Sequence, residues 1–353
     1  MRREVVLVTG AAGEMGQALI ARLAEEGGHA ILAVDLSPLP EETRKRCHVA
    51  LAGDILDEAL LERLASRYAI STIFHLAAVL SSRGELLPEA AHRVNVDGTL
   101  GLLRTATEET RRLERPVTFL FPSSVAVYGL PDLQMKALAG AVTEDEWTTP
   151  VTMYGCNKLY CEHLGRYYSR HYRQLDASAA LGRVDFRALR FPGLISAATL
   201  PSGGTSDYGP EMIHAAARGE AYACFVREDT RMPFMAMPDA IEALLGLQRA
   251  RRARLTRFVY NVSGFSPTAG RILERVRREF ADADVRFEPD PRRQRIVDSW
   301  PADQDDSCAR SDWGFAPAYD EDRAFDAYLF PAVWRRYHSR GAPGGAPFLL
   351  RSR

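Results

Sequence analysis

The sequence lacks paired cysteines. Its cysteines are odd in number, and no two of them stand in a C-x-x-C spacing: Cys47, Cys156, Cys161, Cys224 and Cys308. A disulfide framework or a structural zinc site normally needs such pairs, so neither is expected. One helical stripe, His163, Tyr167 and His171, faces no acidic pair, and we interpret it as core or interface packing. The chain is therefore predicted to hold no metal, to keep reduced thiols and to be cytoplasmic.

The sequence also lacks an excess of charge and any long apolar run. Lys and Arg number 45 and Asp and Glu number 46, which gives a net charge of −1. This balance argues against nucleic acid or an anionic membrane as a partner, and no run is long enough to span a bilayer. Residues 1–4 lead straight into an apolar run, so no signal peptide is expected. The 353 residues allow one large domain or two smaller ones.

What the sequence does contain is a glycine-rich turn between two apolar runs. Val5–Val8 ends at Thr9-Gly10-Ala11-Ala12-Gly13-Glu14-Met15-Gly16, a helical pattern follows, and the run Ala30–Val34 ends in Asp35. Glycines let the backbone approach a pyrophosphate, the helix N-terminus offers it N–H groups, and the carboxylate accepts ribose hydroxyls. A plain glycine turn would explain the glycines alone. The flanking strands and the acid favour a dinucleotide site.

Apolar runs and helical patterns alternate through the first half of the chain. This alternation predicts an α/β fold with a doubly wound parallel sheet. Further strands are expected at 49–52, 70–76, 117–121 and 184–189. Helices are expected at about 57–67, 89–113 and 153–174.

The pattern loosens after Arg190. We predict a dinucleotide-binding domain over 1–192, to which a strand at 257–262 returns. A smaller, discontinuous region over 193–335 is expected to bind substrate, with helices near 210–219 and 238–250. The stretches 130–150, 174–183 and 197–210 are interpreted as loops, and 336–353 as a disordered tail.

A tyrosine and a lysine stand four residues apart at the start of the helix expected from residue 153. This spacing places Tyr154 and Lys158 on one helix face. A phenol has a pKa near 10, and a nearby ammonium favours the phenolate, so the pair can take a proton from a hydroxyl group. A solvated surface pair is the alternative. The position after the fifth strand favours catalysis.

The spacing G-x-x-G-x-x-G resembles that of the short-chain dehydrogenase/reductase (SDR) superfamily, and other segments resemble its extended branch. In Pro122-Ser123-Ser124 the resemblance makes Ser124 the serine that bonds the substrate oxygen, with Ser123 supporting it or touching the nicotinamide. Lys158 is expected to hold the nicotinamide ribose as well. Because Asp35 precedes Leu36 rather than an arginine, NAD is expected instead of NADP. The cofactor-binding residues expected from the motif and the resemblance are Gly10, Gly13, Glu14, Met15, Gly16, Asp35, Asp54, Ile55, Leu76, Ala77, Ala78, Asn95, Ser123, Tyr154, Lys158, Pro192, Leu194 and Ile195.

Later segments resemble the SDR-type L-threonine 3-dehydrogenases over about residues 1–335. The segments that carry this resemblance are 189–196, 202–208, 224–240, 298–301, 305–307 and 312–315. It implies NAD-dependent oxidation of the threonine β-hydroxyl to 2-amino-3-oxobutyrate. The substrate-binding residues implied are Ser81, Ser124, Gly193, Thr205 and Ser206. Ser206 stands where the family commonly has a second threonine, and Cys156-Asn157 replace small or hydroxyl residues.

Two other functions remain open at this point. A sugar-nucleotide epimerase or dehydratase of the same superfamily needs basic groups for a diphosphate, and Arg218, Arg227 and Arg231 are scattered candidates. A cofactor-sensing or scaffold protein would be expected to lose part of the Ser/Tyr/Lys set. Extended SDRs typically pair two long helices from each subunit, so we predict a homodimer through 89–113 and 153–174. The apolar positions offered are Val94, Leu100, Leu102, Leu103, Leu159, Leu164, Tyr167 and Tyr168.

Overall fold

A parallel seven-stranded sheet forms the centre of the computed structural model, which describes residues 2–176, 182–201 and 203–338. Its order is β11-β7-β5-β4-β1-β2-β3, and every described pairing is parallel. The strands are β1 Arg3–Thr9, β2 Ile31–Asp35, β3 Val49–Ala52, β4 Tyr68–His75, β5 Thr118–Ser124, β7 Asp185–Phe191 and β11 Val259–Asn261. Chain order reverses between β1 and β4, which makes this a doubly wound sheet, the predicted fold class.

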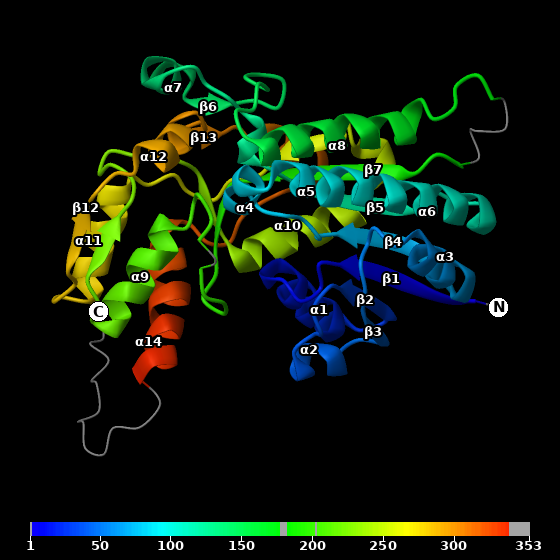
Figure 1. The fold of residues 1–353 in the computed structure, drawn as a ribbon, viewed down its shortest axis with the longest axis horizontal. Coiled ribbons are helices and arrows are strands. Elements are labelled where there is room, and N and C mark those ends of the chain that lie inside the picture. Colours follow the sequence, from blue (N-terminus) through cyan, green and yellow to red (C-terminus); the bar gives the residue numbers. More distant parts are fainter. Residues whose placement is uncertain (1, 177–181, 202, 339–353) are drawn as a thin grey trace.

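Helices cover both faces of this sheet, in the right part of Figure 1. Buried residues of α1 and α10 share one apolar cluster, and buried residues of α3, α6 and α8 share another on the opposite face. Covering both faces explains why β7 is buried along its whole length. The helices of this half are α1 Glu14–Glu26, α2 Glu41–Lys45, α3 Glu58–Arg67, α4 Ser81–Leu86, α5 Pro88–His92, α6 Gly98–Leu113, α8 Met153–Arg170 and α10 Met237–Arg249.

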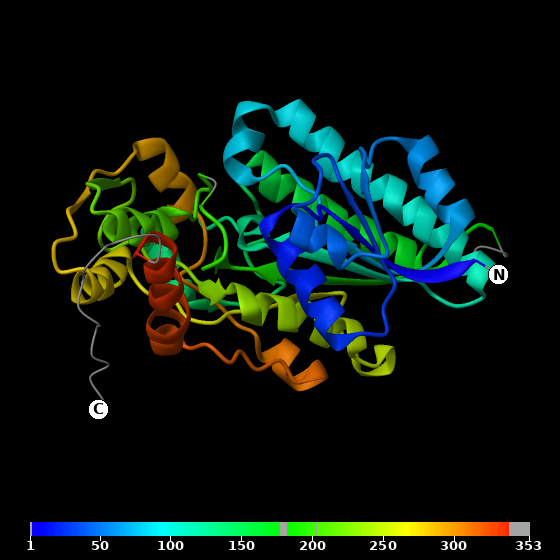
Figure 2. The ribbon, with the colours of Figure 1, turned by 90° about the horizontal axis from the view of Figure 1, so that it is seen from below.

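The C-terminal region forms the left part of Figure 1 and lies beside the sheet in the turned view of Figure 2. In the described chain, it contains short parallel strand pairs: β8 Gly193–Ile195 with β10 Phe234–Ala236, and β9 Tyr222–Cys224 with β12 Val285–Phe287. Its helices are α9 Tyr208–Arg218, α11 Ala269–Glu279, α12 Pro291–Asp298, the π-helical η5 Arg323–Leu329 and α14 Phe330–His338. The helix α13 Ser307–Trp313 packs instead on the sheet side, in the apolar cluster of α1 and α10. A separate apolar cluster holds this region together.

Four expected segments differ from the structure. The helix predicted over 89–113 is interrupted by a π-helical turn, η1 Arg93–Asp97. The loop predicted over 130–150 contains α7 Leu133–Ala139, which Asp132 caps, and β6 Ala141–Val142, which pairs with β13 Asp303–Gln304. The predicted tail begins inside α14, and 339–353 lie outside the described residues. Helix α8 ends at Arg170 rather than 174.

Only some of the apolar residues predicted to contact a second copy are exposed. Leu102, Leu103 and Tyr168 are buried within the chain itself, whereas Tyr167 is 40% exposed. The histidine stripe lies on the same exposed side, since His163 and His171 are exposed too. Core packing therefore does not explain that stripe, and the interface interpretation stays a prediction. No helix in the described residues has the length and apolar character that crossing a membrane requires.

Candidate active site

The glycine turn after β1 is tightly packed. Gly10 has φ +69°, and a Cβ atom there would lie 2.5 Å from the Ala77 nitrogen. Gly13 forms the N-cap of α1 without a side-chain hydrogen bond, so the first N–H groups of the helix have no side-chain cap. Free N–H groups at a helix N-terminus and a backbone without Cβ atoms are what a pyrophosphate needs. The turn therefore fits the phosphates of a dinucleotide.

Asp35 at the end of β2 closes this turn from the other side. Its Oδ2 accepts a hydrogen bond from Ala12 N at 3.0 Å, and its Oδ1 accepts one from Ser37 N at 2.9 Å. The carboxylate is thus held beside the glycine turn and also lines the pocket in front of it. That position suits the adenosine ribose, as the sequence predicts.

One pocket of about 780 Å³ joins the glycine turn to the end of β5 and to the loop after β8. Most of the predicted site residues line it: Gly10, Gly13, Glu14, Met15, Gly16, Asp35, Ile55, Leu76, Ala77, Ala78, Ser81, Ser123, Ser124, Tyr154, Lys158, Pro192, Gly193, Leu194, Thr205 and Ser206. A volume of this size is typical of cofactor sites.

Three predicted residues do not line the pocket. Asn95 instead braces its wall, because its Oδ1 accepts from Val79 N at 2.8 Å and its Nδ2 donates to Val79 O at 3.0 Å. Asp54 accepts a hydrogen bond from Leu56 N at 2.9 Å. Ile195 is fully buried in the apolar cluster of the C-terminal region.

The predicted catalytic side chains converge at one end of the pocket. Ser124 ends β5, and Tyr154 and Lys158 lie in the first turns of α8, which Thr152 caps by accepting from Gly155 N at 3.0 Å. Ser124 hydrogen bonds to the Tyr154 phenol. Lys158 donates to Pro122 O at 2.6 Å, and its Nζ lies 5.5 Å from the centre of the Tyr154 ring.

Burial has the largest effect on the pKa values of Tyr154 and Lys158. Desolvation raises the pKa of Tyr154 to about 12, and the hydrogen bond with Ser124 opposes the change. Desolvation also lowers the pKa of Lys158 to about 8, against the opposing influence of Cys161 and Glu162. The net lowering of the phenol pKa that the sequence predicts is therefore not what this structure has. The charged forms are costly because the pair is removed from water.

Behind the predicted catalytic residues lies a buried polar network that the sequence analysis missed. Ser123 donates to Glu162, whose carboxylate pairs with Arg190 through two hydrogen bonds at 2.9 and 2.7 Å. Arg190 also donates to the Tyr128 hydroxyl at 3.0 Å, and Tyr128 donates to Asn261 at 2.6 Å. The network ties β5, α8, β7 and β11 together. Ser123 thus supports the site from behind.

The side of the pocket predicted to bind substrate is formed by a loop that contacts α4. Ser81 and Thr205 share a hydrogen bond of 3.1 Å, and both side chains are buried. Ser82 donates to Gly203 O at 2.9 Å, and Arg293 of α12 donates to Gly204 O at 2.7 Å. Segments from three parts of the chain therefore meet where a substrate would face Ser124 and Tyr154.

Many of the residues that line the pocket were not predicted, among them Trp300 and Arg83. Trp300 is buried and lines the pocket, and its indole Nε1 has no hydrogen-bond partner within the described structure. Arg83 also lines the pocket, and it is exposed. The segment 298–301 is one of those resembling the threonine dehydrogenases, but nothing in it marks Trp300 as a pocket residue.

The arginines that a sugar diphosphate would need lie elsewhere. Arg227 and Arg231 line a different pocket, and Arg218 pairs with Glu220 at the surface. Among the described residues, the cationic side chains of the cofactor pocket are Lys158 and Arg83.

Comparison with known proteins agrees with this geometry. Residues 6–263 match the NAD dependent epimerase/dehydratase family. The mitochondrial L-threonine 3-dehydrogenase of Bos taurus is 33% identical over 328 residues, which cover 89% of this chain and 79% of that protein. An uncharacterized epimerase/dehydratase of Staphylococcus saprophyticus is 32% identical over 317 residues, covering 89% and 92%.

A solved structure gives the same result. The monomeric L-threonine 3-dehydrogenase from a metagenome, in its apo form, superposes with a TM-score of 0.82 at 34% identity, covering 94% of this chain and 100% of that chain. The fold, the glycine turn and the matched residues thus agree, and NAD-dependent chemistry of the SDR type follows from them. The chain belongs to the NAD dependent epimerase/dehydratase family, the extended branch of the short-chain dehydrogenases/reductases.

Proposed function

We propose that the protein is an NAD-dependent L-threonine 3-dehydrogenase. The observation that carries this proposal is the hydrogen bond between Ser81 and Thr205, beside Ser124 and Tyr154 in one pocket. Short hydroxyl groups on a loop and a helix suit a small zwitterion, whose ammonium and carboxylate need several close polar partners. The loop backbone is held at two neighbouring glycines, since Gly203 O accepts from Ser82 of α4 and Gly204 O accepts from Arg293 of α12.

In the proposed reaction, the threonine β-hydroxyl loses its proton and its Cβ loses a hydride. Bound NAD⁺ would accept this hydride, and the products would then be 2-amino-3-oxobutyrate, NADH and one proton. A bound nicotinamide supplies the hydride acceptor and nothing else. Tyr154 accepts the hydroxyl proton, and Ser124 donates a hydrogen bond to the same oxygen, as its contact with the Tyr154 phenol allows.

Lys158 has an electrostatic role in this scheme. A positive charge within the pocket favours the phenolate that a base requires. Burial raises the pKa of Tyr154, and the hydrogen bond with Ser124 opposes that change. The Lys158 ammonium also donates to Pro122 O, which holds it at the wall of the pocket. Asp35 repels a 2′-phosphate, so the proposal includes a preference for NAD over NADP.

The alternative function, epimerization or dehydration of a sugar nucleotide, has weaker support. A diphosphate needs basic side chains along the cleft, and Arg227 and Arg231 line another pocket. We therefore rank it second.

A spectrophotometric assay tests the proposed function. The purified protein is mixed with NAD and L-threonine, D-threonine, L-serine or L-allo-threonine, and NADH formation is measured, then repeated with NADP. L-Threonine with NAD is expected to give the highest kcat/KM. No NADH with L-threonine, together with epimerization of a UDP-sugar, would show that only the superfamily assignment is right. Equal kcat/KM with both cofactors would contradict the role of Asp35.

We also propose that two copies associate through α6 and α8. Tyr160 and Tyr167 on α8 are 53% and 40% exposed, and Leu100 and Leu164 are half-buried. Burying these side chains against a second copy would remove apolar surface from water. Light scattering at micromolar concentration should report a dimer, and Tyr167→Glu should shift it toward a monomer. A monomeric parent protein would contradict this arrangement, and the metagenomic relative is described as monomeric.

A further inference from the structure

The loop that carries Thr205 is also held by an arginine that does not line the cofactor pocket. Arg293 of α12 donates to Gly204 O at 2.7 Å, and its guanidinium carbon lies 3.2 Å from the centre of the Phe225 ring. The Arg293 side chain is half-buried. A planar guanidinium can bond a carbonyl at its edge while its face lies on an aromatic ring, and a lysine ammonium cannot do both.

The turn that Arg293 contacts is tight. Gly204 N donates to Asp207 Oδ2 at 2.7 Å, and Asp207 N donates to Gly204 O at 3.1 Å. A Cβ atom on Gly204 would lie 2.9 Å from Asp207 Oδ1. Thr205 and Ser206 are the two residues enclosed by this turn, and both line the cofactor pocket. The position of Gly204 O therefore determines where their hydroxyl groups lie.

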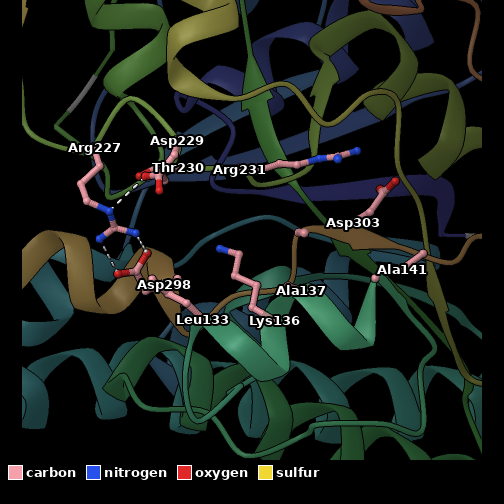
Figure 3. A pocket seen from close by; sticks show the side chains of 12 residues that line it. Leu133, Lys136, Ala137, Ala141, Arg227, Asp229, Thr230, Arg231, Asp298 and Asp303 are labelled. Carbon is pink, nitrogen blue, oxygen red and sulfur yellow. Dashed lines mark hydrogen bonds and ion pairs between the residues drawn. The ribbon is translucent and has the colours of Figure 1, made fainter.

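The position of Arg293 is itself fixed, because α12 is tied to the segment after β9 at both ends. At the start of the helix, Asp290 N donates to Phe225 O at 2.9 Å. At its end, Asp298 accepts two hydrogen bonds from Arg227, at 2.9 and 3.0 Å, which Figure 3 shows as dashed lines. Arg293 lies in the first turn of this anchored helix.

The aromatic ring in contact with Arg293 is fixed as well. Phe225 is buried, and Tyr208 packs edge-on against it, with ring centres 6.0 Å apart. Tyr208 begins α9, directly after the turn. Arg293 therefore joins the turn to the apolar cluster that also holds the start of the following helix.

We propose that Arg293 is a positioning residue for the amino-acid substrate, which it affects by holding Gly204 O and so placing Thr205 and Ser206. The identity of the substrate in this inference rests on the proposed function. Because Arg293 stands outside the pocket, it acts through the turn rather than on the reacting atoms. Its loss should weaken substrate binding and leave the chemical step at Tyr154 intact.

An electrostatic role toward Glu211 is the alternative that an experiment has to separate. Burial raises the pKa of Glu211, and a hydrogen bond from Tyr222 and the charge of Arg293 oppose that change. Glu211→Gln removes the carboxylate charge and still offers Tyr222 an acceptor. If Arg293 acts through Gly204, this substitution should leave the turn and the substrate affinity unchanged.

Hydrogen exchange on the full chain in saturating NADH tests the hold on the turn without turnover. In Arg293→Met, the amides of residues 203–207 should exchange about tenfold faster than in the parent protein, because one anchoring hydrogen bond is lost. Arg292→Met removes an exposed neighbour on the same helix and should keep parental exchange, as should Glu211→Gln. Parental exchange in Arg293→Met overturns the proposal, whatever the substrate is.

Steady-state kinetics with L-threonine and NAD test the consequence for the substrate. Arg293→Met should raise KM about tenfold, while kcat and the NADH Kd stay within a factor of about three. Arg293→Lys keeps a donor without the planar fork, and it should recover at most half of the loss. Arg292→Met should keep the parental KM.

The outcomes distinguish the failure of this proposal from the failure of the proposed function. A fall in kcat with an unchanged KM in Arg293→Met, or an equal rise of KM in Glu211→Gln, overturns the positioning role. If the parent protein does not oxidise L-threonine, the proposed function fails, and the exchange measurement still decides whether Arg293 holds the turn. If Arg293→Met does not fold, Arg293→Lys is used in both measurements, and parental exchange together with a parental KM overturns the proposal.

Discussion

The two sides of the active-site pocket are built by different means. On the cofactor side, backbone meets backbone: Gly10 approaches Ala77 so closely that a Cβ atom has no room, and buried strands fix both. On the substrate side, a loop is held to α4 and α12 by a few side-chain hydrogen bonds, including that between Ser81 and Thr205. Close packing therefore fixes the shape of the cofactor side, and it tolerates little change. Single polar contacts hold the shape of the substrate side.

The largest effect is expected at Tyr154, where the two sides of the pocket meet and the proposed reaction takes place. Tyr154→Phe removes the proton acceptor, and kcat should fall by about a thousandfold or more, since general-base catalysis contributes roughly 10²–10⁴-fold. NADH affinity, measured by fluorescence, should stay within a factor of about three. Tyr160→Phe, an exposed tyrosine of the same helix, is the control and should keep full activity. Half of the parental activity in Tyr154→Phe would rule out this base.

Two matched glycine substitutions compare the sides directly. Gly10 and Gly203 both have positive φ, +69° and +83°, but a Cβ atom on Gly203 would meet nothing within 4 Å. Gly10→Ala should weaken NADH binding by about a hundredfold or prevent folding, which circular dichroism will reveal. Gly203→Ala carries only the backbone strain, about 1 kcal/mol, and should leave the NADH Kd unchanged. If the two substitutions weakened NADH binding equally, the proposed difference between the closely packed cofactor side and the substrate side would be wrong.

The pH dependence of turnover sharpens the comparison further. Because burial raises the pKa of Tyr154 to about 12, the phenolate fraction should grow with pH, and kcat should rise by up to tenfold per unit between pH 6 and 8. Lys158, whose pKa burial lowers to about 8, loses its charge above that pH, so the rise should level off. KM for threonine should change less. A kcat that falls from pH 6 to 8 would contradict the assigned base.

The smallest effect is expected for a single contact on the substrate side. Thr205→Val keeps the shape of the side chain and removes the hydroxyl that bonds Ser81. In the proposed complex, this hydroxyl also bonds a charged group of the substrate. Such a hydrogen bond contributes about 1.5–3 kcal/mol, so KM for L-threonine should rise about tenfold or more. The NADH Kd should not change, which separates this loss from general damage. An unchanged KM would remove Thr205 from the substrate site.

The sequence was sufficient to predict those parts of the fold and site that depend on a short local pattern. The turn from Gly10 to Gly16, the acid at Asp35 and the Tyr154–Lys158 spacing each depend on neighbours within about 25 residues or one helix turn. The doubly wound sheet follows from the same alternation and is confirmed. The resemblance to the threonine dehydrogenases added the later segments, which no local pattern explains.

The parts that sequence reasoning missed depend on distant partners. The strand β6 exists because residues 303–304 pair with it, and a two-residue strand has no pattern of its own. The π-helical turn η1 leaves the apolar spacing of its helix almost unchanged, so 89–113 resembles one continuous helix. The Glu162–Arg190 pair joins two buried polar residues whose partnership only the folded chain reveals.

The edge strand β11 has a consequence for biosynthesis. It pairs with β7 at residues 188–190, yet it is made only at residues 259–261, after the substrate loop, α9 and α10. Until then, the nascent chain leaves one edge of β7 without its neighbour, and open edges favour pairing with other chains. Synthesis at about 5–20 residues per second makes this interval several seconds long. The sheet is therefore completed late during translation. Slower synthesis of residues 192–258 would prolong the time for which the edge of β7 is open, and it should lower the yield of native protein.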